Sequence, residues 1–407
     1  MNTTTAQAFS LPSAAPAAAR TVFALLKKLQ HGTLDVQMPD GAQARFGSGA
    51  AHEPKAALRL VDWRVCSAAL KSGDIGFAEA YIDGHWTTPD LAALLRLFIA
   101  NRDAMDSVIY GTWWGSLVYR LKHLLNRNSR SGSKKNIHAH YDIGNSFYKL
   151  WLDETMNYSS ALFEGDFSRP SSQAQTAKVR RALAECGVGA GDRVLEIGCG
   201  WGALAQEAAA GLGARVTGVT LSTEQLAFAQ ERMQRLGVAE RADLRLQDYR
   251  DISDGPYDAV ASIEMFEAVG REYWASYFQT VHRQLKPGGR ACIQTITIRD
   301  DLFERYVKST DFIQQYIFPG GLLPSPQAFR AEARRAGLEV VNERAFGPDY
   351  AETLRRWRAD FMDRDSQVRQ LGFDTRFMRI WEFYLAYCEA AFDTGNTDVI
   401  QFTLRRP

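Results

Sequence analysis

Three glycines in one short stretch, Leu195-Glu196-Ile197-Gly198-Cys199-Gly200-Trp201-Gly202, mark the part of this chain best suited to hold a ligand. The stretch follows a short apolar run and precedes a segment of helical pattern. Glycine there allows a tight turn and lets a ligand approach the backbone closely. The spacing is GxGxG, whereas dinucleotide sites use GxGxxG to hold a pyrophosphate. The pattern therefore predicts a nucleoside ligand without a pyrophosphate, and Glu196 suits a cationic group on that ligand.

The same stretch resembles the first motif of Rossmann-like methyltransferases. Lys286-Pro287-Gly288-Gly289 lies at the expected distance, before a later strand. The resemblance implies S-adenosylmethionine as the cofactor. The second strand ends at 218–225 without the acid that commonly holds a ribose, so a polar side chain such as Gln225 is expected to serve instead. Ser222 or Thr223 has the alternative role of capping the following helix.

A wider resemblance covers about residues 136 to 407. In that range the chain is similar to the cyclopropane fatty acid synthase and mycolic acid methyltransferase family. The segment 73–86 also looks like the N-terminal domain of the longer members, which act on phospholipid. The motifs that carry the resemblance are His140-Tyr141-Asp142-Ile143-Gly144-Asn145, Met156-Asn157-Tyr158-Ser159-Ser160, Leu195 to Gly202, Gly218 to Gln225, Met265-Phe266-Glu267-Ala268-Val269-Gly270, Tyr316-Ile317-Phe318-Pro319-Gly320-Gly321 and Phe346-Gly347-Pro348-Asp349-Tyr350.

Carried over position by position, these motifs give an expected cofactor site. Glu196 and the glycines hold the amino-acid part, the end of the second strand holds the ribose, and the end of the third strand borders the adenine. The expected residues are Tyr158, Ser159, Glu196, Gly198, Cys199, Gly200, Trp201, Gly202, Thr220, Leu221, Ser222, Gln225, Asp248 and Tyr249.

The resemblance also implies a reaction. The double bond of an unsaturated fatty acyl chain in phospholipid takes the methyl carbon, and a carbocation forms. A base, by resemblance a bound bicarbonate, then removes a proton, and a cyclopropane ring closes. A hydride shift before proton loss would leave a methyl-branched unsaturated chain. Two further alternatives are N-methylation of a small amine and a non-catalytic lipid-binding protein that kept the fold.

By resemblance, Glu267 is the carboxylate of the bicarbonate site, Tyr350 donates its hydroxyl to the anion, and Ile296 supplies a backbone group. Two positions depart from the family pattern: Ser160 replaces a cysteine and Gln294 replaces a histidine. Both can still donate hydrogen bonds to an anion. Cys388 matches a cysteine once proposed as catalytic in the family, although an aromatic helix around it favours an inert core thiol.

The elements that position these residues alternate between strand and helix from about residue 175. Such alternation predicts an α/β fold with a doubly wound, mostly parallel sheet, which is the Rossmann-like class I methyltransferase fold. Ligands bind such sheets outside the carboxyl ends of the strands. The remaining expected parts are a disordered tail at 1–20, a small α+β domain at 21–105, a basic linker at 106–135 and a methyltransferase domain at 136–407. Within that domain, residues 302–330 form a helical insert that roofs an acyl tunnel.

Charge and composition set the expected partners. The net charge is +1, yet no Asp or Glu occurs between Asp106 and Asp142, where Lys and Arg gather beside Trp113 and Trp114. A basic segment with aromatics at 107–141 predicts contact with an anionic phospholipid bilayer, not with nucleic acid. His138 and His140 lack ligand partners, so no metal is expected. The sequence leaves the oligomeric state open, a homodimer included.

The expected location is the cytoplasm, with peripheral association at the inner face of the membrane. Five scattered cysteines without a CxxC pair favour a reducing compartment over a disulfide framework. No run of about 18 apolar residues is present that would span a bilayer. The N-terminal stretch lacks the basic start and apolar run of a secretory signal.

Overall fold

The computed structural model describes residues 11–13, 15–49, 53–102 and 143–407. The chain divides into two compact units, the first made of residues 1–121 and 375–390, the second of 122–374 and 391–407. Residues 375–390, which we expected within the methyltransferase domain, thus group with the first unit. The basic linker, the expected bilayer contact at 107–141, and His138 and His140 lie outside the described residues.

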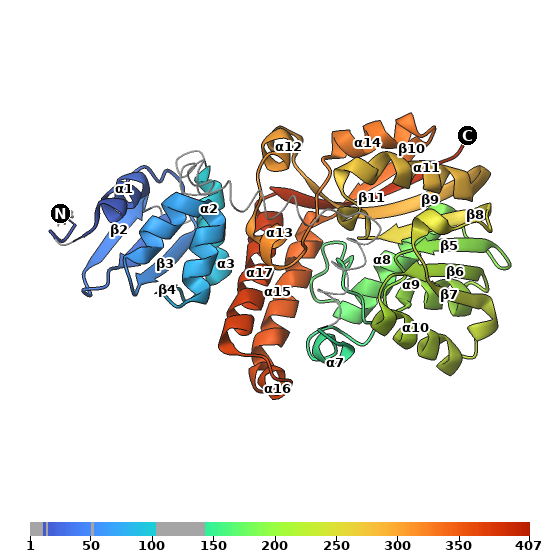
Figure 1. The fold of residues 1–407 in the computed structure, drawn as a ribbon, viewed down its shortest axis with the longest axis horizontal. Coiled ribbons are helices and arrows are strands. Elements are labelled where there is room, and N and C mark those ends of the chain that lie inside the picture. Colours follow the sequence, from blue (N-terminus) through green and yellow to red (C-terminus); the bar gives the residue numbers. More distant parts are fainter. Residues whose placement is uncertain (1–10, 14, 50–52, 103–142) are drawn as a thin grey trace. The chain divides into compact units, whose positions relative to one another are not determined.

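The first unit contains a four-stranded sheet in the order β2-β1-β3-β4 (Figure 1). β1 and β2 form an antiparallel hairpin, and in its turn Met38 N donates to Ala42 O. β3 runs parallel to β1. The strands are β1 (Thr33–Gln37), β2 (Gln43–Gly47), β3 (Lys55–Leu60) and β4 (Trp86–Thr87).

Helices α1 (Ala17–Leu26), α2 (Arg64–Ile82) and α3 (Leu91–Ala100) belong to this unit, as does most of α17 (Thr375–Asp393). Tyr81 of α2 donates its hydroxyl to Glu382 of α17 at 2.6 Å, and Arg96 of α3 pairs with Glu389. Helix α1 corrects the expected disordered tail at 1–20. It begins at Ala17 because the alanine-rich stretch after Pro16 favours a helix and buries Ala19.

The second unit is built on a seven-stranded sheet in the order β10-β11-β9-β8-β5-β6-β7. β5, β6, β7, β8 and β9 run parallel, and β11 lies antiparallel between β9 and β10. The expected mostly parallel sheet is confirmed. The strands are β5 (Arg193–Ile197), β6 (Arg215–Thr220), β7 (Ala242–Leu246), β8 (Tyr257–Ile263), β9 (Leu285–Ile298), β10 (Glu339–Ala345) and β11 (Thr397–Arg405).

One detail of β9 differs from expectation. We expected Lys286-Pro287-Gly288-Gly289 to lie before the strand, but β9 already pairs with β8 at Leu285. The pairing then shifts register and resumes at Arg290. The KPGG segment is therefore a bulge within β9, where the left-handed φ of +80° at Gly288 favours glycine.

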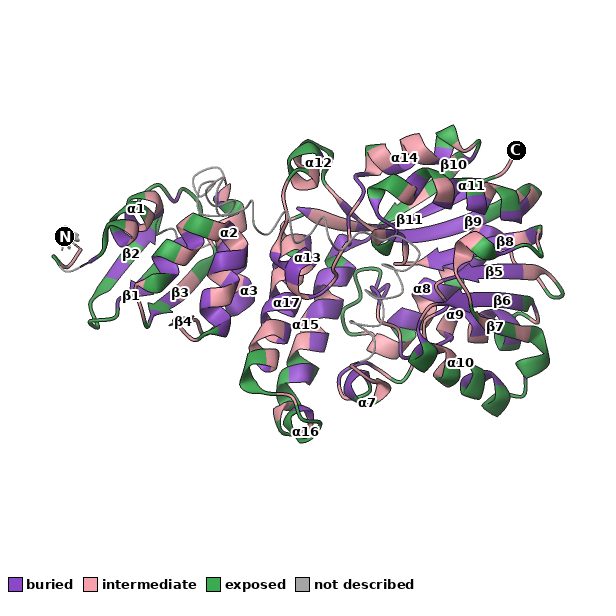
Figure 2. Ribbon diagram, in the orientation of Figure 1, coloured by how far each residue is buried: buried purple, intermediate pink, exposed green. Residues whose placement is uncertain are grey.

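Apolar side chains alternate between two cores on the two faces of this sheet. Leu195, Val260 and Ile293 pack with α11 (Trp274–Gln284) and α14 (Pro326–Arg335). Their strand neighbours Val194 and Cys292 pack on the other face with α8 (Ser171–Cys186) and α9 (Ala203–Gln206). Figure 2 shows the strands between these layers as largely buried. Helices on both faces give the doubly wound architecture.

The remaining helical elements are shorter or follow the strands above. The insert expected at 302–330 includes most of α12 (Asp300–Val307), all of α13 (Phe312–Tyr316) and the start of α14. Its role as the roof of a tunnel stays a prediction. In the described part of the chain, no helix is long and apolar enough to cross a membrane. The other elements are α7 (Asn145–Tyr148), η1 (Glu207–Gly211), α10 (Thr223–Arg235), η2 (Ala239–Arg241), η3 (Tyr249–Asp251), η4 (Phe266–Ala268), η5 (Arg271–Tyr273), α12 (Asp300–Val307), α13 (Phe312–Tyr316), α15 (Gly347–Asp363) and α16 (Asp365–Gln370).

Candidate active site

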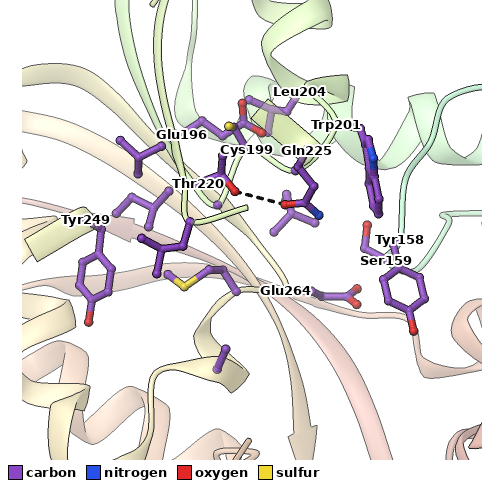
Figure 3. Close-up of a pocket in the computed structure, with 18 of the residues that line it drawn as sticks. Tyr158, Ser159, Glu196, Cys199, Trp201, Leu204, Thr220, Gln225, Tyr249 and Glu264 are labelled. Carbon is purple, nitrogen blue, oxygen red and sulfur yellow. Dashed lines mark hydrogen bonds between the residues drawn. The ribbon is translucent and has the colours of Figure 1, made fainter. Parts of the chain in front are cut away.

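The site lies where the strand order of the sheet reverses. β5 has β6 and then β7 on one side, and β8 and then β9 on the other, so the strand order reverses at β5. This is the point at which open α/β sheets bind ligands, outside the carboxyl ends of the strands. Glu196 lies near the end of β5, and Glu264 directly follows β8. Both residues line one pocket (Figure 3).

The glycine turn after β5 forms one wall of this pocket. Gly198 has a φ of +86°, and a Cβ at this position would lie 2.8 Å from Cγ of Met265. Gly198 N and Cys199 N both donate to Val219 O of β6, which fixes the turn to the neighbouring strand. Only glycine fits this combination of left-handed backbone and close approach.

Glu196 supplies an acceptor for a cationic ligand. Burial raises the pKa of this carboxyl well above its ordinary value. Among the described residues, its Oε2 atom is buried without a hydrogen-bond partner. A buried carboxylate oxygen without a donor is unfavourable, and a ligand ammonium would satisfy it. The expected role of Glu196 therefore fits the geometry.

Most residues expected around the cofactor line this one pocket. Gly202 and Ser222 are not among the lining residues. A Cβ at Gly202 would lie 3.0 Å from Cβ of Ala229, so this glycine allows α9 to pack on α10. Ser222 accepts from Gln225 N and is the N-cap of α10, the alternative role expected for it. The lining residues are Tyr158, Ser159, Glu196, Gly198, Cys199, Gly200, Trp201, Thr220, Leu221, Gln225, Asp248 and Tyr249.

We expect Gly198→Ala to weaken cofactor binding at least tenfold, about 1.4 kcal/mol, because the new Cβ forces Met265 and the turn apart. Isothermal calorimetry with the cofactor measures this effect. The control is Gly237→Ala, which has a similar φ of +67° but nothing within 4 Å of its Cβ. An unchanged dissociation constant for Gly198→Ala would show that the turn does not shape the pocket.

Glu264 is the residue that sequence reasoning missed. Its Oε1 accepts from Ser160 N at 2.9 Å and from Nε2 of Gln294 at 2.7 Å, and its Oε2 accepts from the Tyr350 hydroxyl at 2.6 Å. Figure 3 shows its side chain pointing from the end of β8 toward Tyr158 and Ser159. Its place one residue beyond a central strand was a signal that could have identified it.

This geometry corrects the expected anion site. Ser160, Gln294 and Tyr350 do come together, but around Glu264 and not around Glu267. Glu267 instead accepts a hydrogen bond from Ile296 N at 2.5 Å. These two residues, both expected at the anion site, therefore do lie together. Gln401 of β11 donates to Oε1 of Gln294 at 2.9 Å, which turns the amide nitrogen of Gln294 toward Glu264.

A buried lysine, also missed, lies behind the pocket wall. Lys178 of α8 is completely buried and donates to Oγ of Ser159 at 2.5 Å and to Asn157 at 3.3 Å. Burial lowers the pKa of Lys178 to about 8, while the charges of Glu264, Asp153 and Glu196 act in the opposite direction. A cation therefore lies behind the pocket wall, among carboxylates.

The two glutamates after β8 have different surroundings, and both have raised pKa values. Burial raises the pKa of Glu264, and Lys178, Tyr350, Ser160 and Gln294 oppose that rise. Burial, and then the negative charge of Glu264, raise the pKa of Glu267 to about 8. The three donors and the nearby ammonium of Lys178 favour the ionised form of Glu264, whereas Glu267, with a pKa of about 8, favours the protonated form at neutral pH.

Cys388 lies on α17, in the segment that groups with the first unit. It is partly buried. Its expected catalytic role stays a prediction.

Comparisons with known proteins identify relatives of this chain. The family model described as mycolic acid cyclopropane synthetase matches residues 128–402. The tuberculostearic acid methyltransferase UfaA1 of Mycobacterium tuberculosis is 39% identical over 407 aligned residues, which cover 97% of this chain and 93% of that protein. The cyclopropane-fatty-acyl-phospholipid synthase of Escherichia coli K12 is 32% identical over 338 residues, covering 83% of this chain and 84% of that protein.

Among solved structures, the mycolic acid cyclopropane synthase CmaA1 in complex with SAH and CTAB superposes with a TM-score of 0.63. It is 32% identical in sequence, and the match covers 67% of this chain and 98% of that one. The second unit of the present chain thus has a Rossmann-like methyltransferase fold.

Proposed function

Because this chain belongs to the mycolic acid cyclopropane synthetase family, we propose that it methylates the double bond of an unsaturated fatty acyl chain and leaves a methyl-branched unsaturated chain. Family and relatives establish the coarser statement that the protein is an S-adenosylmethionine-dependent methyltransferase acting on lipids. The assignment of an alkene as the methyl acceptor rests on one observation, the buried carboxylate of Glu264 in the pocket wall.

S-adenosylmethionine fits the pocket, and when bound it supplies an electrophilic methyl group to the alkene. Glu196 would hold its ammonium group through the oxygen that otherwise has no donor. Gly198 leaves room along the turn, and Gln225, whose Oε1 accepts from the Thr220 hydroxyl at 3.2 Å, lies where a ribose is expected. These residues bind and orient the methyl donor.

Methylation of an alkene leaves a positive charge on the acyl chain, and the pocket wall is built to stabilise such a charge. Glu264 is shielded from water, and Lys178 and its three donors favour its ionised form, whose attraction for a nearby cation is strong. Aromatic rings lie close by, since Tyr158 and Trp357 have centroids 5.4 Å apart and Tyr350 and Trp357 6.3 Å. Ring faces add cation–π stabilisation.

The choice of product rests on the relatives. The relative that aligns with 97% of this chain is named a methyltransferase of tuberculostearic acid, which supports the branched product. The 32% identical relative from Escherichia coli is named a cyclopropane synthase, so ring formation is the second candidate. Both products arise from the same cation and differ in which proton is lost and when.

We further propose that the acyl chain belongs to an intact phospholipid at the surface of a bilayer. The basic stretch at 107–141, which has no acidic residue, supports this proposal through its charge. The name of the Escherichia coli relative, which includes fatty-acyl-phospholipid, supports it as well.

Mass spectrometry of labelled lipids tests this function. The protein is expressed in a host that lacks its own cyclopropane synthase and is fed methyl-deuterated methionine. We expect label in the fatty acids of the phospholipid fraction, with the double bond retained. Three deuteriums in the product would mean that the proton was lost from the acyl chain. Two deuteriums would mean that it was lost from the new methyl group.

The other outcomes decide against parts of the proposal. Two deuteriums with the double bond consumed would mean a cyclopropane ring. Label in free fatty acids alone would exclude the phospholipid substrate. Unlabelled lipids, with the protein present and folded, would overturn methylation of the alkene and favour a small-amine substrate or a non-catalytic role.

A further inference from the structure

We propose that Glu264 takes the place of the bound bicarbonate and is itself the catalytic base, so that this enzyme turns over without added anion. The inference rests on the proposed function, since it concerns the cation formed on the acyl chain. The Glu264 carboxylate accepts the hydrogen bonds of Ser160, Gln294 and Tyr350, which were expected to hold the anion.

A bicarbonate does not fit the groups that resemblance assigned to it. Ser160 N, Nε2 of Gln294 and the Tyr350 hydroxyl all donate to Glu264, and Ile296 N donates to Glu267. The Ser160 hydroxyl, for its part, donates to Ala161 O at 2.9 Å. Each donor of that set is therefore already engaged by an oxygen of the chain, and a second anion would meet the charge of Glu264.

The backbone at Glu264 supports a functional reason for this arrangement. Its φ is +49°, in the left-handed region that side chains other than glycine, asparagine and aspartate rarely adopt. Strain of this kind persists where the surroundings hold a residue in place, often at active sites. Here Glu264 N donates to Gln294 O at 2.8 Å, and the side chain makes the three bonds above. The protein thus holds a strained residue so that its carboxylate reaches the donors.

The proton balance of the step is complete with this base. The π electrons of the alkene form the new carbon–carbon bond, and the bond from sulfur to methyl breaks with its electrons on sulfur. An oxygen of Glu264 then takes a proton from a carbon next to the cationic centre or from the new methyl group. The electron pair of that C–H bond forms the product double bond or the ring. The proton later leaves Glu264 to solvent.

The test uses purified full-length protein, unsaturated phospholipid vesicles and labelled S-adenosylmethionine, in buffer freed of carbon dioxide. We expect wild-type turnover to be the same with and without added bicarbonate. Glu264→Gly relieves the left-handed strain and opens a space lined by the three donors. Its turnover should fall about 100-fold without bicarbonate and recover to within about tenfold when bicarbonate is added.

Glu264→Gln is the matched variant, because its amide still fills the space but carries no charge. It should lose turnover about 100-fold and not respond to bicarbonate. Cofactor binding by calorimetry shows that both variants are folded. A wild type that requires bicarbonate, a Glu264→Gln enzyme with normal turnover, or a folded Glu264→Gly enzyme that ignores bicarbonate would each overturn the inference. A wild type that labels no lipid under any condition would instead overturn the proposed function.

Discussion

Lys178→Met is expected to lower turnover about 100-fold at neutral pH and to shift the acid limb of the pH–rate profile to higher pH. The buried ammonium of Lys178 favours the ionised form of Glu264, so the pKa of Glu264 rises further when that charge is removed. Turnover should therefore recover in part as the pH is raised. The measurement is kcat against pH with saturating cofactor and lipid.

Gln175→Leu is the matched control for this prediction. Gln175 lies on the same helix, is equally buried, and donates to Ser159 O at 2.8 Å, but it carries no charge. It should alter the loop that carries Ser159 without moving the acid limb. If Lys178→Met and Gln175→Leu shift the profile equally, the lysine acts through packing and not through its charge.

Glu267→Gln is expected to flatten the dependence of stability on pH. The pKa of Glu267 is raised from 4.5 to about 8 in the folded protein, so the folded state binds the proton more tightly than the unfolded state. This group therefore contributes stability below pH 4.5 that is lost as the pH rises toward 8. Glutamine can still accept from Ile296 N but has no proton to lose.

Urea unfolding at about pH 5 and pH 8 measures this prediction. The free energy of unfolding should fall less between these two pH values in Glu267→Gln than in the wild type, by roughly a few kcal/mol. Glu304→Gln is the control, since that carboxylate is 71% exposed and pairs only loosely with Lys308, at 3.7 Å. An identical pH dependence in Glu267→Gln and wild type would show that Glu267 is ionised in the folded protein.

Much of the fold could be predicted because the pattern of apolar residues is local. The alternating strands and helices after residue 175, the glycine turn after β5 and the hairpin of β1 and β2 each depend on neighbours in sequence. The insertion of β11 between β9 and β10 depends on a pairing across about a hundred residues, and sequence periodicity does not record such pairings. The bulge at KPGG was missed for the same reason, since it depends on the register with β8.

The candidate site, like the fold, could be predicted only in part from the sequence. Motifs identified the three donors Ser160, Gln294 and Tyr350. They did not identify the common acceptor, because the motif comparison indicated Glu267, whereas the donors bind Glu264, three residues earlier. The choice between the two depends on the left-handed backbone of Glu264, a conformational feature that residue types do not reveal. Lys178 was missed because a lysine within a helical pattern is usually solvated.

The left-handed backbone at Glu264 also bears on how such an enzyme can change over evolutionary time. Glycine is the residue that best tolerates this conformation, and glutamate and glycine codons differ by a single base. One point mutation would therefore exchange a built-in carboxylate for an empty space without disturbing the main chain. A single nucleotide change at this position could therefore convert an enzyme that uses its own carboxylate into one that needs an anion from the cell.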